Sequence, residues 1–162
     1  MKKGFTMIEL IFVIVILGVL ASVAIPRLAA TRDDAEVAKA ATNLTTAVSD
    51  ITAYYTAKGS FPTSAQQNFD KITNALTKNG KLNVKGSTTC VTVTLPTAKT
   101  NPTASDKVEL LLDFSKGTDP VCKQLAKLPG IKTMCQVDTT KASTAVTSTC
   151  KIQIGGSGGI QF

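Results

Sequence analysis

The chain opens with an apolar run that carries one charge near its N-terminal edge. Residues 10–25 contain no charged side chain, and only Gly18 and Ser22 interrupt the hydrophobic sequence. Counted from Phe5, the run is about 21 residues, or about 31 Å of helix, which is enough to cross a bilayer. Glu9 lies inside this span, although carboxylates are rare in membrane-spanning helices and are then usually functional.

Two ordinary interpretations of this segment are a cleaved signal peptide and a membrane anchor. A signal peptide has a basic start and a small-x-small cleavage site, which Lys2 and Lys3 and the string Ser22-Val23-Ala24 nearly supply. Glu9 argues against it, because a charge costs about 2.5–3.5 kcal/mol at the centre of a membrane helix and less near its end. Pro26 would also follow closely on the cut. An anchor would keep the two lysines in the cytoplasm and place the C-terminal part outside.

A second hydrophobic pattern has helical spacing. Between Pro26 and Gly59 the chain contains no further proline or glycine. Intervals of 4, 3, 4, 3 and 4 positions place six residues on one helix face: Val37, Ala41, Leu44, Val48, Ile51 and Tyr55. The two patterns predict one helix from about Phe5 to Ala57, about 80 Å long, with a kink or local opening at Pro26.

Beyond Gly59 the pattern changes to short elements between turn residues. Two short helices are predicted, one opened by Ser64 and Gln67 as a capping box and ended by Asn79-Gly80, the other opened by Asp119-Pro120 and ended by Pro129-Gly130. Alternation predicts strands at Cys90–Leu95, Val108–Phe114, Cys150–Ile154 and, more weakly, Thr133–Val137. The sequence therefore predicts an α+β fold, with the amphipathic half of the long helix packed on a small antiparallel sheet.

The residues around Glu9 also form a recognisable motif. The string KGFTMIEL, residues 3–10, resembles the prepilin cleavage and methylation motif of type IV pilins and type II secretion pseudopilins. The resemblance implies cleavage between Gly4 and Phe5 by a prepilin peptidase, N-methylation of Phe5, and an assembly role for Glu9 with Phe5. Gly18 and Pro26 lie where many family members have helix-weakening residues. The resemblance covers about the first 30 residues closely and the rest only in general plan.

This resemblance implies a pilin-like organisation. Residues 1–4 are a leader peptide, 5–26 a transmembrane and filament-core helix, 27–58 the amphipathic half of the helix, and 59–162 a globular head. The expected protein is a structural subunit of a type IV pilus-like filament. It is held in the bacterial inner membrane with its head in the periplasm, and is then polymerised with identical or homologous subunits by an inner-membrane assembly platform.

Three alternatives to a pilus subunit stay open at this point. Two of them are other filament subunits: a type II secretion pseudopilin, acting as a piston for protein export, and a DNA-uptake pilus subunit. A pseudopilin is favoured by a resemblance to a segment of major pseudopilins, carried by Tyr-Tyr at 54–55 and Gly-Ser-Phe-Pro-Thr at 59–63. A pilin is favoured by the expected two disulfides and by the lack of a clear calcium loop. The third is not a filament subunit but a membrane-anchored periplasmic binding module that never polymerises.

Four cysteines, Cys90, Cys122, Cys135 and Cys150, all follow the apolar segment. None forms a CxxC pair, and zinc sites ask for tighter spacing. If the apolar segment carries the rest of the chain out of the cytoplasm, the oxidising compartment favours two disulfides. Four cysteines allow three connectivities. We predict Cys122–Cys135, closing a loop around the second short helix, and Cys90–Cys150, joining two strands.

Composition argues for a structural protein without a cofactor. The chain has no histidine, which removes the usual general base and the commonest metal ligand. Its formal charge of +7 comes from scattered lysines and arginines, which argues against a nucleic-acid patch. Asp106, Glu109 and Asp113 are spaced like calcium ligands, but solvated carboxylates explain them better, because a calcium cage needs ligands that converge from one ordered loop. We therefore predict neither an enzyme nor a metal site.

Overall fold

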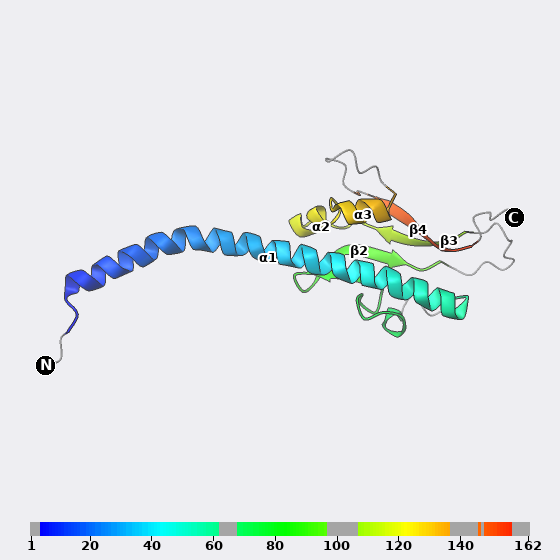
Figure 1. Ribbon diagram of the computed structural model, residues 1–162, viewed down its shortest axis with the longest axis horizontal. Helices are drawn as coiled ribbons and strands as arrows, with labels where there is room; N and C mark the ends of the chain where they lie inside the picture. Colours follow the sequence, from blue (N-terminus) through cyan, green and yellow to red (C-terminus); the bar gives the residue numbers. More distant parts are fainter. Residues whose placement is uncertain (1–3, 62–67, 97–106, 137–145, 147, 157–162) are drawn as a thin grey trace. The chain divides into compact units, whose positions relative to one another are not determined.

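A computed structural model describes residues 4–61, 68–96, 107–136, 146 and 148–156 (Figure 1). The chain forms two compact units, residues 1–35 and 36–162, which are described separately. Helix α1, Met7–Lys58, begins in the first unit and ends in the second. It confirms the single long helix, which continues through Pro26. Residues 36–58, predicted as the end of the helical segment, belong to the same compact unit as the head.

The head contains a four-stranded antiparallel sheet. Its strands are β1, Lys81–Val84; β2, Thr88–Thr94; β3, Val108–Asp113; and β4, Thr149–Gly155. They lie in the order β1-β2-β3-β4, so each strand pairs with its neighbour in the chain. The three main predicted strands and the α+β class are confirmed. Strand β1 was not predicted, because its four residues include only two apolar ones.

The buried face of α1 packs into the core of the head. Leu44, Ala47 and Ile51 are fully buried, and Val37 and Ala40 are nearly so. Ala41 and Val48 are only partly buried against the core, so the face is centred slightly to one side of the predicted stripe. At its start Glu36 accepts a hydrogen bond from the β1–β2 turn, and near its end Tyr55 lies against Gly155 of β4. This half of α1 therefore reaches from one edge of the sheet to the other.

The short helices follow the predictions only in part. Helix α2, Pro120–Leu125, is confirmed, and the Asp119 carboxylate caps it by accepting from the Val121 N–H at 2.8 Å. Pro129 was predicted to end this helix but begins α3, Pro129–Met134, because proline is well suited to a first helical position. The strand predicted at Thr133–Val137 is therefore wrong.

The first short helix is also largely wrong. Its predicted caps, Ser64 and Gln67, lie outside the described residues, and only a 3-10 turn, η2 at Phe69–Lys71, follows. The Thr73 hydroxyl donates to Asp50 Oδ2 at 2.7 Å and accepts from the Ala75 N–H at 3.2 Å. These bonds hold the backbone after the turn in a non-helical path against α1.

The predicted cysteine pairing is corrected by the structure. Disulfides join Cys90 to Cys122 and Cys135 to Cys150, with Cα atoms 5.0 and 5.3 Å apart. The predicted Cys90–Cys150 bond is ruled out because β3 lies between β2 and β4, which puts their backbones about 9–10 Å apart, beyond disulfide reach. The predicted Cys122–Cys135 bond is also wrong, because Cys122 lies in α2 and bonds to β2, whereas Cys135 caps the end of α3 and bonds to β4.

Gly80 should be essential to this core. It has φ +71°, and a Cβ there would lie 2.7 Å from the Val93 carbonyl oxygen and 2.5 Å from the Phe69 ring. We expect Gly80→Ala to lower the free energy of unfolding by about 2–5 kcal/mol, combining left-handed strain with overpacking. Gly86→Ala is the matched control, because φ is +89° but nothing lies within 4 Å, so only about 1–2 kcal/mol is lost. Equal losses in denaturant unfolding of the two full-length variants would contradict this account.

Candidate functional site

Helix α1 begins at a reciprocal pair of hydrogen bonds between Thr6 and Glu9. The Thr6 N–H donates to Glu9 Oε2 at 2.9 Å, and the Thr6 hydroxyl donates to the same oxygen at 2.7 Å. In return the Glu9 N–H approaches Thr6 Oγ1 at 3.4 Å. This arrangement is a capping box, in which the residue before the helix and the third helical residue satisfy each other's backbone donors.

The capping box gives Glu9 a role within its own chain. The first turn of a helix has backbone N–H groups without helical partners, and leaving such a group unsatisfied in an apolar environment costs several kcal/mol. A carboxylate is also favoured at the positive end of the helix dipole. Thr6 was overlooked in the sequence analysis, although Thr-x-x-Glu before an apolar run is the signature of a capping box.

Gly4 and Phe5 precede the helix and are accessible. Both lie before the first helical residue, and the Phe5 side chain is 84% exposed. A Cβ at Gly4 would meet nothing within 4 Å. Packing against the described residues therefore gives no reason for glycine at position 4.

The helix that follows presents a continuous apolar surface. Among the described residues, every exposed large apolar side chain lies between Phe5 and Leu28. Soluble monomers rarely expose contiguous apolar patches of more than a few hundred Å². The helix is also long and apolar enough to span a membrane, and its apolar window is entirely unburied within the chain. Gly18 lies inside this surface, and a Cβ there would also meet nothing within 4 Å.

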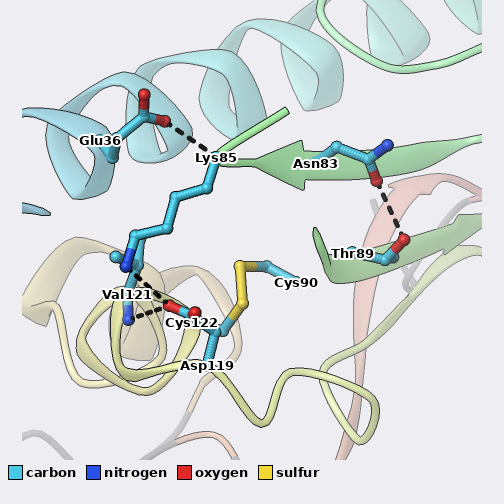
Figure 2. The surroundings of a disulfide bond; sticks show 8 residues. All are labelled: Glu36, Asn83, Lys85, Thr89, Cys90, Asp119, Val121 and Cys122. Carbon is cyan, nitrogen blue, oxygen red and sulfur yellow. Dashed lines mark hydrogen bonds and ion pairs between the residues drawn. A yellow bond between two sulfur atoms is a disulfide. The ribbon is translucent and has the colours of Figure 1, made fainter. Parts of the chain in front are cut away.

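A polar cluster joins three elements of the head beside one disulfide (Figure 2). The backbone N–H of Lys85, in the β1–β2 turn, donates to Glu36 of α1 at 3.4 Å. The Lys85 ammonium pairs with Asp119, the cap of α2, at 3.5 Å. Cys90 and Cys122 are bonded next to these residues. The cluster contains no arrangement of a nucleophile and a base, and its geometry is that of a structural connection.

The calcium candidates do not converge in the part of the chain that the structure describes. Asp106 lies outside it, and Glu109 pairs with Lys151 across β3 and β4 at 3.1 Å. Hydrogen bonds from the side chain and backbone N–H of Ser115 lower the pKa of Asp113. No group of three or more His, Cys, Asp or Glu side chains suited to a metal occurs among the described residues.

The chain is similar to a known family and to three curated proteins. The family described as the prokaryotic N-terminal methylation motif matches residues 1–25. Three relatives are named type II secretion system core protein G. The relative from Dickeya chrysanthemi is 37% identical over 65 residues, 40% of this chain and 42% of its own. Those from Klebsiella michiganensis and Aeromonas hydrophila are 34% and 33% identical, over 40% and 45% of this chain and 46% and 50% of their own.

The chain thus spans about half the length of the curated relatives it matches. No solved structure gives a significant match.

Thr6 and Glu9 should control the order of the first helical turn. We expect Thr6→Val to lose the cap, at about 1 kcal/mol, and to speed amide hydrogen exchange in the first turn of the detergent-solubilised chain. Thr6→Ser keeps the hydroxyl and should exchange like the wild type. Unchanged protection in Thr6→Val would show that the cap does not order this end of the helix.

Proposed function

We propose that the protein is a structural filament subunit of a type II secretion pseudopilus. The matches that support this proposal are those to the type IV pilin and pseudopilin family. Members of this family are structural subunits and not enzymes. The three relatives support the pseudopilus over the pilus, because each is named as a secretion core protein.

The observation that carries the proposal is the apolar surface between Phe5 and Leu28. A helix with this surface is stable in a bilayer, where its backbone bonds are satisfied internally. The same surface is stable against apolar helices of other subunits, since van der Waals packing between helices replaces packing against lipid. A subunit of this kind can therefore be stored in the inner membrane and moved into a filament without exposing the surface to water.

The start of the chain fits processing before assembly. Cleavage between Gly4 and Phe5 would remove the leader ahead of the helix and create a positive α-amine on Phe5. The capping box would survive, because the Thr6 N–H belongs to the peptide bond that follows Phe5. The accessible position of Gly4, and the absence of a packing reason for glycine there, support recognition by a separate peptidase.

Glu9 would then have a second role between subunits. Both Thr6 bonds end on Oε2, and among the described residues no hydrogen bond is made by Oε1. Hydrogen bonds do not remove the net negative charge, which is costly in an apolar environment unless a positive group is near. The α-amine of Phe5 on a neighbouring subunit supplies that charge and would fix the axial register of the filament.

A type IV pilus subunit is the second candidate. The two head disulfides favour it, whereas the segment resembling major pseudopilins favours the first candidate. In that segment Phe61 stacks with Tyr54 and Tyr55, at centroid distances of 5.9 and 5.6 Å. The stacks fix the chain as it leaves α1, which both candidates require, so the choice depends on experiment.

Complementation of a deletion strain tests the proposal. We expect the plasmid-borne wild-type chain to begin at N-methylated Phe5 by mass spectrometry and to restore export of secreted enzymes. Gly4→Val should begin at Met1 and restore no export, with the unfolding midpoint of the head unchanged, since the new side chain meets open space.

The alternatives give other results. A wild-type chain beginning at Met1 or Ile25 would refute the filament proposal in favour of an anchored module or a cleaved signal peptide. Surface filaments in sheared material, together with normal export in the deletion strain, would favour the pilus.

Glu9→Gln separates the two roles of Glu9. Glutamine serves as well as glutamate at this capping-box position, so protection of the first helical turn should stay normal. The charge is lost, so we expect normal N-terminal processing but at least about tenfold fewer filaments under overexpression. A tenfold decrease corresponds to losing about 1.4 kcal/mol per subunit from the pairing of Glu9 with the Phe5 α-amine.

Glu9→Ala is the matched variant that loses both roles. It should add rapid amide exchange at the start of the helix to the same assembly defect. Wild-type filament yield from Glu9→Gln would limit Glu9 to its role in the capping box.

A further inference from the structure

The two disulfides hold opposite ends of one segment of the head. Cys122 lies in α2 and is bonded to Cys90 in β2, whereas Cys135 caps the C-terminal end of α3 and is bonded to Cys150 in β4. All four cysteines are at most 8% exposed. The position of α2 and α3 on the sheet is thus fixed covalently at both ends.

The bonds also follow the order of the cysteines in the chain. The first cysteine is joined to the second across 32 residues, and the third to the fourth across 15. The competing pair, Cys122 with Cys135, is 13 positions apart and closes a shorter loop than either. Loop-closure entropy separates the 13- and 15-residue loops by only about 0.1 kcal/mol, so in an unfolded chain with all four thiols exposed it would not prevent this wrong bond.

We propose that both disulfides are introduced in sequence by a thiol oxidase as the chain emerges on the outer side of the membrane, without a disulfide isomerase. When Cys122 emerges, Cys90 is the only other cysteine outside. Cys135 follows 13 residues later, about 1–3 s at synthesis rates of about 5–20 residues per second. If Cys90 and Cys122 pair in that interval, Cys135 has only Cys150 as a partner.

The chemistry of each step balances with one oxidised enzyme molecule. A cysteine thiolate of the chain attacks the disulfide of the oxidase and forms a mixed disulfide, releasing one enzyme thiolate. The second cysteine of the chain attacks the mixed disulfide, forms the native bond and releases the other enzyme thiolate. The two thiols of the chain lose two protons and two electrons, and the enzyme disulfide is reduced to a dithiol.

The inference rests on the export of the head in the proposed function. Variants that each lack one cysteine test the order of pairing, and the thiols of the wild-type chain test export itself. In a host lacking the isomerase, we expect Cys90→Ala to give Cys122–Cys135 as the major disulfide, with Cys150 free for alkylation. If folding selected the partners instead, this variant would keep Cys135–Cys150 and leave Cys122 free. Peptide mapping after rapid alkylation distinguishes the two and does not require a folded product.

Cys150→Ala is the matched control. It removes a cysteine that emerges last, so Cys90–Cys122 should form at the wild-type level and Cys135 should remain free. Cys135–Cys150 as the major bond in Cys90→Ala would overturn the inference, whatever the control shows.

The wild-type chain adds a test of the enzyme class. Both native bonds should form at unchanged yield without the isomerase, and all four thiols should be alkylated without the oxidase. A need for the isomerase, or native bonds at full yield without the oxidase, would overturn the inference alone. Four free thiols in a host with an active oxidase would instead refute export of the head, and the proposed function with it.

Discussion

The apolar surface between Phe5 and Leu28 constrains the rest of this molecule. Among the described residues no other part of the chain buries these side chains, so the segment needs lipid or other apolar helices around it. From Glu36 onward the same helix belongs to the folded head, and its apolar side chains turn inward to the core. One helix thus serves two environments, and its pattern changes between residues 28 and 37 from apolar on all sides to apolar on one face.

In an apolar environment the start of the helix needs hydrogen-bond partners from outside the helical backbone. A membrane helix satisfies its own backbone except at its ends, and Thr6 and Glu9 supply partners there. Glutamine would serve the capping box equally well and would bring no charge into an apolar segment. The capping box therefore explains why a polar acceptor stands at position 9, but not why it is ionisable. The helix dipole favours the charge by only about 0.3–1 kcal/mol, whereas a positive group on another molecule would offset much more of its cost in an apolar environment.

The sequence predicted the elements with strong periodicity and missed those whose form depends on contacts elsewhere. The long helix, three strands and the Asp119 cap follow from local pattern. Strand β1 is too short to carry a pattern, and the path after η2 depends on the bond between Thr73 and Asp50, 23 positions apart. The cysteine pairing depends on strand order: only the position of β3 between β2 and β4 rules out Cys90–Cys150. At the candidate site Glu9 was recognised as unusual, whereas its bond to Thr6 was available from the sequence and overlooked.

The glycines fall into two groups, those that contacts within the fold require and those that they do not. Gly80 and Gly155 are fixed by the chain itself, because a Cβ at the first would strike Val93 and Phe69 and at the second the Tyr55 ring. Gly4 and Gly18 have open space around them, and glycine inside a helix is about 1 kcal/mol less favourable than alanine. Gly18 weakens its own helix without easing any contact among the described residues, and Gly4, which precedes the helix, meets no such contact either, so both indicate a constraint from outside. At Gly4 a peptidase that binds the backbone closely would impose it, and at Gly18 the close approach of a second helix.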